Sequence, residues 1–447
     1  MPIGKIEIPA IGNEVVIVML VVPHILIAAF IIGIVLIAAT SEYVGMLTKQ
    51  PKYDRFAHNA SKFTVLLFAT GSSLAITFIL MLITLYPVFW SYMQNIFFWV
   101  LLAEAFMFVG EILLLYSWYV SWEKLGYRKR LHIAMGFMTA LFLVAQMTFI
   151  DVVGSYMMTP TEGAPPTDVG WTFLNPTFMP LNMHRFVGNL SYAGFLIAGW
   201  AAWRYLRSTS EGDREYYDWM GHWGLMWGFG FLLLQPVVGF GYFKEIREHN
   251  DAAFTYLMLG DKSWLFNLLM IWLGIMSVTS VAYCLHKLKF AVTPMPTLRN
   301  MLLGALGFMA IFSLLNVIPS DGNLVPQIGL IIFGGKEAKF PLGGMYPWKY
   351  FGLIGMMLVG IFVLGLYLKA AAGGFRWGRA SRWSQYALMI TAVTVVLTMM
   401  TMGYARETAR RATDPDGSGG SLINGCITLD QKIVPEGCGP AESRLSP

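Results

Sequence analysis

Residues 15–39 read VVIVMLVVPHILIAAFIIGIVLIAA, a stretch without a single Asp, Glu, Lys or Arg. One helix needs about 20 predominantly apolar residues to cross the hydrocarbon core of a bilayer, so this stretch is long enough to span a membrane. Similar runs recur along most of the 447 residues, of which 56% are hydrophobic and 13% charged. Soluble domains carry about 25% charged residues. The chain is therefore expected to be all-α, a polytopic helical bundle in a lipid bilayer.

Windows of about 20 apolar residues predict about ten transmembrane helices. The expected ranges are 15–40, 63–88, 96–120, 132–157, 183–205, 219–242, 264–286, 298–318, 347–369 and 384–403. Runs of this length exclude a β-barrel, whose strands alternate over ~10 residues. The sequence after the last range is polar and rich in Gly and Ser. We therefore expect a transmembrane domain over 1–410 and a flexible polar tail over 411–447.

Lys and Arg gather in the connections that follow the odd-numbered helices, for example Lys49, Lys52 and Arg55 after the first. Cytoplasmic loops carry such an excess, so both termini are expected on the outer side of a cytoplasmic membrane. The formal net charge of +5 then reflects topology. Because these cations form no continuous basic stripe, no nucleic acid partner is expected.

Two of the seven histidines, His24 and His184, lie within apolar segments near the expected outer side. A single histidine on an apolar helix is more often a hydrogen-bonded core residue than a metal ligand. Two at one depth on different helices make iron ligation an equally good interpretation. A cytochrome b of the bc type or a haem-copper oxidase needs more histidines at membrane depth. A haem protein with this sequence must use further ligands such as Glu or Met.

Acidic residues in or beside the apolar ranges include Glu42, Glu104, Glu111 and Asp151, of which Asp151 lies near the outer boundary, where it could simply be solvated. Glu104 and Glu111 are seven residues apart, which places them on one helix face about 10 Å apart along the axis. Carboxylates in hydrocarbon are costly and by default mark an ion path, a proton relay or a metal site. A hydrogen bond between helices is the alternative. Glu42, at the inner end of the first helix, belongs either to a proton route or to a helix cap.

Four cations lie at outer helix ends, against the usual charge bias. They are Arg185, Lys349, Arg406 and Arg410. Such cations can neutralise the carboxylates of a bound anionic cofactor. Snorkelling toward lipid headgroups explains any one of them equally well. As a group they favour the cofactor.

Four stretches resemble subunit I of the cytochrome bd family of respiratory quinol oxidases. They are PHILIAAFIIGIVLIAATSE (23–42), EAFMFVGEILLLYSWYVSWEKL (104–125), LNPTFMPLNMHRF (174–186) and MGYARETARR (402–411). Their order, spacing and expected membrane side agree with that family. The second stretch resembles the helix that carries two essential glutamates in the family.

This resemblance implies two or three haems, of b type or of b and d types. His24 matches the ligand of a high-spin haem at the oxygen-reducing site, and His184 matches the histidine ligand of the low-spin haem b. Glu407 matches the carboxylate ligand of a high-spin haem, with Arg410 close by. Haems with weak or open axial positions bind small gases.

The sequence departs from the family at the other ligand of the low-spin haem. In YPWKYFGLIG (346–355), Lys349 matches the family's basic residue, and Phe351 stands where the family has Met. Met345, about one turn before Lys349, is the substitute ligand that we consider. A five-coordinate site or a changed function is the alternative.

Two further departures concern spacing and loops. The family's two glutamates are eight residues apart, whereas Glu104 and Glu111 are seven apart. The family's long hydrophilic outer loop, implicated in quinol binding, is replaced by the apolar ranges 264–286 and 298–318.

The expected function is that of a haem-containing electron-transfer subunit of a bd-like terminal oxidase. It would oxidise a quinol or a cytochrome at the outer side and reduce dioxygen to water, with protons drawn from the inside past Glu42, Glu111 and Glu104. A second membrane subunit in a prokaryotic cytoplasmic membrane is the expected partner. One alternative is a haem anchor of another redox complex that exchanges electrons with quinone without reducing oxygen. A proton-coupled transporter is a third, but the inverted repeats typical of transporters are not evident.

Overall fold

A computed structural model describes residues 8, 12–160, 173–258, 260–317, 347–411, 421–423, 427–428 and 431–434. Its elements are α1 (Asn13–Thr48), α2 (Pro51–Leu85), α3 (Pro87–Val120), α4 (Lys129–Met158), α6 (Phe178–Arg207), α7 (Glu211–Leu232), α8 (Gln235–His249), α9 (Asp251–Met258), α10 (Ser263–Lys287), α11 (Pro296–Val317), α13 (Pro347–Ala372), α14 (Arg382–Arg411), β1 (Ser421–Ile423) and β2 (Ile427–Thr428). Each of the ten expected ranges overlaps a long helix or helix pair, so the predicted all-α bundle is confirmed.

Nine helical segments within the described residues are long and apolar enough to cross a membrane, with α7 and α8 counted as one. The helix α6 is not among them, although it has 30 residues. Its polar residues, including Asn182, His184 and Arg185, lower its hydropathy. The expected range 219–242 is divided between α7 and α8, because Pro236 starts a new helix at its first turn.

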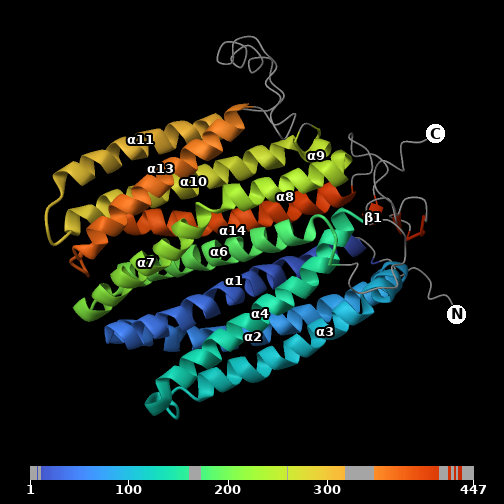
Figure 1. The fold of residues 1–447 in the computed structure, drawn as a ribbon, viewed down its shortest axis with the longest axis horizontal. Helices are drawn as coiled ribbons and strands as arrows, with labels where there is room; N and C mark the ends of the chain where they lie inside the picture. The colour runs from blue at the N-terminus through green and yellow to red at the C-terminus, as the bar shows by residue number, and fades with distance from the viewer. Residues whose placement is uncertain are drawn as a thin grey trace, which may run out of the picture.

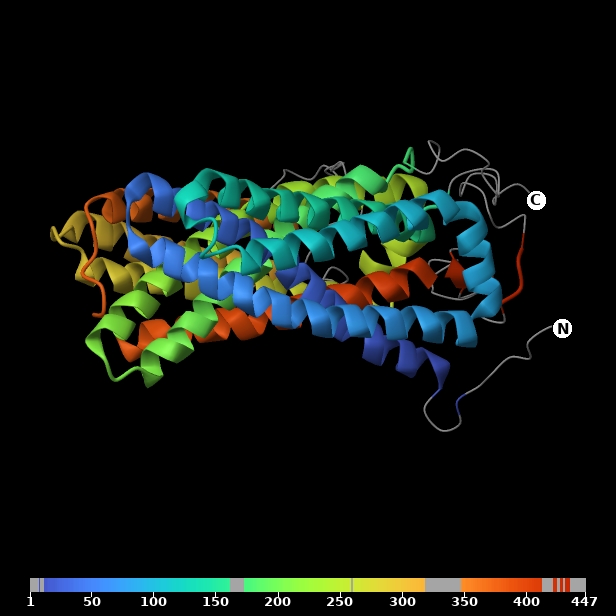
Figure 2. The same ribbon diagram turned by 90° about the horizontal axis from the view of Figure 1, so that it is seen from below.

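The basic connections meet at one end of the bundle, which we call the basic end. There, Lys129 Nζ lies 2.5 Å from Asp54 Oδ1, and Arg55 Nη2 lies 2.9 Å from Asp213 Oδ1. At the opposite end, which we call the terminal end, Arg411 of α14 pairs with Glu14 of α1 at 2.9 Å. The helices run lengthwise between these two ends (Figures 1 and 2). The start of α1 and the end of α14 therefore lie at the same end of the bundle, and the expected topology places both termini on one side of the membrane.

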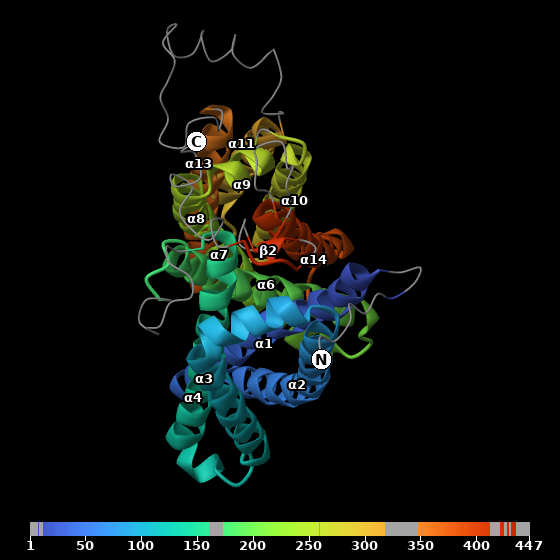
Figure 3. The ribbon, with the colours of Figure 1, turned by 90° about the vertical axis from the view of Figure 1, so that its right-hand side faces the viewer.

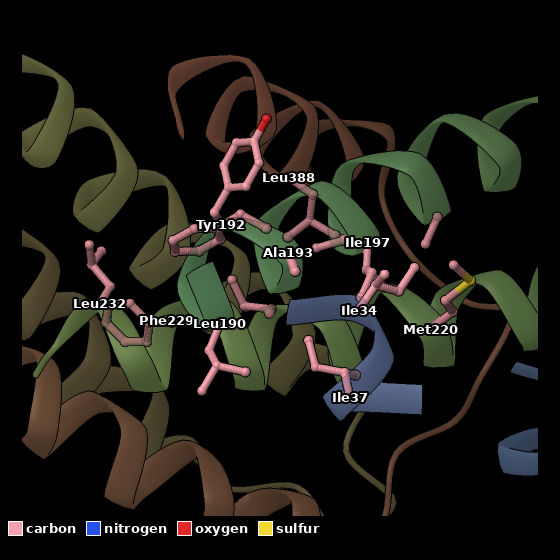
Figure 4. Close-up of a cluster of buried hydrophobic side chains, with 14 of the residues drawn as sticks. Ile34, Ile37, Leu190, Tyr192, Ala193, Ile197, Met220, Phe229, Leu232 and Leu388 are labelled. Atoms are coloured by element: carbon pink, nitrogen blue, oxygen red, sulfur yellow. The ribbon is translucent and has the colours of Figure 1, made fainter. Parts of the chain in front are cut away.

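The helix α6 occupies the middle of the bundle and packs against α1, α7 and α14. The end-on view places α2, α3 and α4 on one side of it and α10, α11 and α13 on the other (Figure 3). Ile34 and Ile37 of α1 meet Leu190 and Ile197 of α6 in the buried core (Figure 4). A Cβ atom at Gly33 would lie 2.5 Å from Ala193 Cβ, so only glycine permits this close approach.

Part of the polar sequence expected as a tail over 411–447 forms two short strands. Residues 421–423 and 427–428 form a two-stranded antiparallel hairpin. Leu422, Ile423 and Ile427 are buried in a cluster with residues of α3, α4 and α6. Burial of these apolar side chains stabilises the docked hairpin. Gln431 also donates a hydrogen bond to the Leu85 carbonyl at 3.3 Å. These residues of the polar tail therefore pack against the helical bundle.

Candidate functional site

His24 lies on α1 in the terminal half of the bundle and is half-buried. Its Nδ1 lies 3.1 Å from the carbonyl oxygen of Gly71 on α2. Because a carbonyl oxygen only accepts hydrogen bonds, Nδ1 must carry the proton. This leaves the lone pair on Nε2, and a backbone carbonyl on the other ring nitrogen is the usual support of a metal-binding histidine.

His184 lies in the second turn of α6, and α8 supports its ring. Tyr242 stacks on the imidazole with ring centroids 6.1 Å apart. The Gln235 amide donates to the His184 carbonyl at 3.3 Å, and a Cβ at Gly239 would lie 3.6 Å from His184 Cε1. The Nδ1 of His184 is buried and has no hydrogen-bond partner among the described residues. An imidazole held in this way retains a nitrogen for a ligand.

A buried ion pair lies next to His184 in the sequence. Arg185 donates to the Asp151 carboxylate of α4, and Asn182 Nδ2 donates to its second oxygen at 3.2 Å. Asp151 is 0% exposed, although its place near the expected membrane boundary suggested a solvated residue. Arg406 of α14 donates to the carbonyl of Gly154, one turn along α4 from Asp151. Arg185 and Arg406 thus come together around α4.

Glu407 is held by two arginines at the terminal end. Arg410 donates to both of its carboxylate oxygens at 2.6 Å, and Arg411 Nε donates at 2.9 Å. Arg410 also donates to the Leu422 carbonyl of the docked hairpin. The expected proximity of Glu407 and Arg410 is present, and both arginines neutralise the carboxylate.

Lys349 occupies a different place from the other three cations. It is fully buried, and its Nζ donates to Asn267 Oδ1 at 2.5 Å and to the Asn316 carbonyl at 3.2 Å. These partners belong to α10 and α11. Phe351 is 50% exposed. Met345 lies outside the described residues.

The two glutamates of α3 differ in their surroundings. Glu104 accepts a hydrogen bond from Gln146 of α4 at 3.2 Å. Glu111 is 1% exposed, and its Oε2 has no partner in the part of the chain that the structure describes. An unpaired buried carboxyl oxygen is costly, and such groups mark functional sites in membrane proteins.

Glu42 has a partner that the sequence reasoning missed. Its Oε1 lies 2.7 Å from Nδ1 of His132, and Nε2 of His132 lies 2.8 Å from the Trp118 carbonyl. Because a carbonyl oxygen only accepts, Nε2 of His132 must donate to it. The short contact between Nδ1 and Glu42 Oε1 then contains one further proton, which can reside on Nδ1 or on Oε1. Both side chains are almost completely buried. No sequence pattern marks this pair, because residues 42 and 132 come together only when α1 packs on α4.

The donor set fits haem iron. Two imidazoles, one with a free Nε2 and one with an unpaired Nδ1, lie on separate helices, and carboxylate and guanidinium groups lie nearer the terminal end. Imidazole and carboxylate are both axial ligands of haem, and guanidinium groups suit its propionates.

A comparison with known families identifies the family of the chain. A family model described as cytochrome bd terminal oxidase subunit I matches residues 15–258, more than half of the chain. The chain belongs to this family. Membership makes the protein part of an oxidoreductase of electron transport, embedded in a membrane, and implies haem cofactors.

A solved structure shows the same fold. The bd oxidase from Geobacillus thermodenitrificans is 15% identical in sequence, with a TM-score of 0.51. The match covers 88% of this chain and 96% of that one. No curated protein matches the sequence.

Proposed function

We propose that this bd subunit I relative is the haem-binding, electron-transferring subunit of a terminal oxidase. It would oxidise a quinol or a cytochrome at the outer side and reduce dioxygen to water with protons from the inside. The observation that carries the proposal is the pair of imidazoles in the terminal half of the bundle. His24 has its Nδ1 engaged by Gly71 and its Nε2 lone pair available, and His184 has a buried Nδ1 without a partner among the described residues.

Each site residue keeps its expected role in this proposal. His24, His184 and Glu407 would hold iron, with Met345 as the further ligand considered. The cofactor's carboxylates would meet the cations Arg185, Arg406, Arg410 and Lys349. Bound haems, of b type or of b and d types, would supply electron transfer and dioxygen reduction. To bind iron, Glu407 would exchange one arginine hydrogen bond for the metal.

Protons would enter at the basic end, which the charge bias assigns to the inside. His58 is half-buried there and stacks on Trp122 at 4.7 Å, and Trp122 contacts His132. The His132 and Glu42 pair can take up a proton on one side and release it on the other, because its shared proton moves between two atoms 2.7 Å apart. The glutamates of α3, Glu111 and then Glu104, would continue the route.

The proposed setting is a prokaryotic cytoplasmic membrane with a second oxidase subunit as partner. Large apolar side chains, among them Leu66, Phe106 and Leu113, are exposed on α2 and α3. Such surfaces need lipid or another membrane helix to cover them.

One observation favours the alternative function of a haem anchor that passes electrons without reducing oxygen. The Glu407 carboxylate accepts hydrogen bonds from both Arg410 and Arg411, which hold it away from an open coordination position. In that case His24 and His184 would still bind haem.

Optical spectra and oxygen consumption of the purified chain test the proposal, with Glu104→Gln, Glu111→Gln and Glu407→Gln made singly. We expect Glu407→Gln to lose haem absorbance. We expect Glu104→Gln and Glu111→Gln to keep haem absorbance but to lose oxygen consumption. Unchanged haem content and oxygen consumption in all three would remove their assigned roles. Carbon monoxide that leaves the reduced spectrum unchanged would favour the haem anchor.

A further inference from the structure

The helix α6 is enclosed along most of its length but exposed on one face at the basic end. Between residues 189 and 202, Trp200 is the one exposed residue, at 52%. Arg204 and Arg207 follow it on the surface, and Trp203 is half-buried. These four residues are three or four positions apart, so they share one face of the helix. The central helix of the bundle therefore presents two tryptophans and two arginines at the basic end.

Aromatic rings support both arginines of this face. The Cζ of Arg207 lies over Trp203, 4.6 Å from the ring centroid, and the Cζ of Arg204 lies 5.1 Å from the centroid of Tyr217 on α7. Trp200 and Trp203 also contact each other, with ring centroids 4.9 Å apart. A guanidinium group that packs against a ring keeps its N–H groups available in its own plane, where they can donate to an anion.

The start of α14 lies beside the end of α6 (Figure 2). The Tyr205 hydroxyl accepts a hydrogen bond from the Ala380 N–H at 3.0 Å, just before α14 begins. Deeper in the bundle, a Cβ atom at Gly199 would touch Ala392 Cβ. Residue numbers therefore rise toward the basic end in α6 and fall toward it in α14, so the two helices are antiparallel.

Both helices are exposed on the same side of this contact. At 3.6 residues per turn, Arg207 lies about 80° round α6 from Gly199 in the direction of the chain. In the same sense, Arg382 and Tyr386 lie about 80° and 120° round α14 from Ala392. In antiparallel helices, such rotations lead to the same side of the pair. The exposed residues thus form one surface, which we call the aromatic-basic patch: Trp200, Trp203, Arg204, Arg207, Arg382 and Tyr386.

The positive charge of the patch is not neutralised within the described part of the chain. No Asp or Glu oxygen of the described residues lies within 4.0 Å of a side-chain nitrogen of Arg204, Arg207 or Arg382. Asp213, at the start of α7, pairs with Arg55 instead. Guanidinium groups gathered on one surface repel one another unless an anion lies among them. The patch is therefore complementary to a negatively charged group.

An apolar strip continues from the patch along α14 toward the middle of the membrane. It consists of the exposed side chains of Ile390, Val393 and Met400. From Arg382 to Val393 the helix rises about 16 Å. One leaflet contributes about half of the hydrocarbon core, which is about 30 Å thick. Trp and Tyr side chains are enriched at the level of the lipid headgroups. A cationic, aromatic surface above an apolar strip of this length has the dimensions of one phospholipid.

We propose that the aromatic-basic patch binds the phosphate headgroup of an anionic phospholipid of the inner leaflet. The three guanidinium groups donate hydrogen bonds to the phosphate oxygens, and the acyl chains lie along the apolar strip of α14. The bound lipid contacts both α6, which carries His184, and α14, which carries Glu407. Binding is noncovalent and does not depend on haem or on the proposed oxidase function.

The test counts lipids bound to the full-length protein in detergent micelles by native mass spectrometry. The patch variant replaces the three arginines of the patch with glutamine. The matched control replaces three exposed cations of the connection between α3 and α4, so it loses the same charge at the same end of the bundle. The substitutions are Arg204→Gln, Arg207→Gln and Arg382→Gln in the patch variant, and Lys124→Gln, Arg128→Gln and Arg130→Gln in the control. The probes are phosphatidylglycerol, which is anionic, and phosphatidylcholine, which has no net charge.

We expect wild type and the control to bind one phosphatidylglycerol saturably and to bind phosphatidylcholine more weakly. The patch variant should bind phosphatidylglycerol at least about tenfold more weakly, because each cation near an anionic lipid contributes about fivefold in affinity. Equal affinity of wild type and the patch variant, or an equal loss in the control, would overturn the proposal. A wild-type protein that does not prefer phosphatidylglycerol would also overturn it and leave the patch to a protein partner.

Inorganic phosphate distinguishes a lipid from a free anion as the ligand. At the concentration of the lipid, we expect inorganic phosphate to leave the bound phosphatidylglycerol in place, because only the lipid also buries acyl chains. Displacement of the lipid by inorganic phosphate would assign the patch to a free anion and refute the lipid site. Thermal unfolding gives a second readout. Phosphatidylglycerol should raise the unfolding temperature of wild type and the control but not of the patch variant, and an equal rise in all three would contradict the site.

Discussion

The buried ion pair between Asp218 and Lys287 gives the sharpest stability prediction. Lys287 Nζ lies 2.5 Å from Asp218 Oδ2, and the two side chains are 1% and 0% exposed. The same carboxylate oxygen accepts from the Gly378 N–H at 3.0 Å, and the ammonium lies 4.6 Å from the Trp377 ring centroid. The pair therefore ties α7 and α10 to the connection before α14. Lys287→Met keeps most of the aliphatic stem but removes the charge.

The expected cost follows from what the substitution leaves behind. Asp218 would remain buried with one backbone N–H as its partner, and breaking a buried pair in this way costs about 3–5 kcal/mol. Replacing both residues, in Asp218→Leu with Lys287→Met, removes the unpaired charge and should restore most of the stability. The exposed pair between Arg55 and Asp213, with side chains 47% and 45% exposed, is the matched control at the same end. Arg55→Met should cost about 0–1 kcal/mol.

Reversible unfolding in mixed detergent micelles measures these free energies in a double-mutant cycle. The reasoning predicts that Lys287→Met is much less stable than Arg55→Met and that the double variant is more stable than Lys287→Met. If Lys287→Met costs no more than the exposed control, the buried pair does not hold these helices together. A double variant with the summed cost of both single variants would refute the argument from an unpaired charge.

Three more predictions test other contacts. His132→Gln removes the imidazole that shares a proton with Glu42, so oxygen consumption should fall at least about tenfold with the haem spectrum retained; unchanged turnover would exclude this pair from the proton route. Trp223→Phe removes the 2.9 Å hydrogen bond to Ser41 between α7 and α1 and should lower the free energy of unfolding by about 1 kcal/mol, measured by detergent unfolding; no change would show that this bond contributes nothing. Ile423→Asp places a charge in a fully buried position and should release the hairpin, so limited proteolysis should cut the tail faster than in wild type; an equal rate would contradict the docking.

Length and hydropathy were sufficient to find the long helices but not their ends. The first range was expected to end at residue 40, yet α1 continues to Thr48, because a helix can extend past the apolar core into polar sequence. Likewise, α2 begins at Pro51, since proline is favoured in the first turn of a helix. The break between α7 and α8 was missed although Pro236 marks it.

The site residues could be named from the sequence, but their partners could not. His24 and His184 are identifiable as polar residues in apolar runs and through their family motifs. The Gly71 carbonyl, Tyr242 and His132 lie on other helices, and only helix packing brings them into contact. The pairing of Glu407 with Arg410 could be predicted from the sequence, because residues three apart on a helix are neighbours.

The haem content of the purified chain tests the central claim that His24 and His184 bind iron. The measurement is the absorption spectrum with haem extraction for wild type, His24→Ala, His184→Ala and the exposed control His249→Ala. The account predicts full haem absorbance in wild type and in His249→Ala. It predicts that His24→Ala loses the absorbance of one haem and that His184→Ala loses the absorbance of another. A wild-type protein without a Soret band, or full haem content in both His24→Ala and His184→Ala, would contradict it.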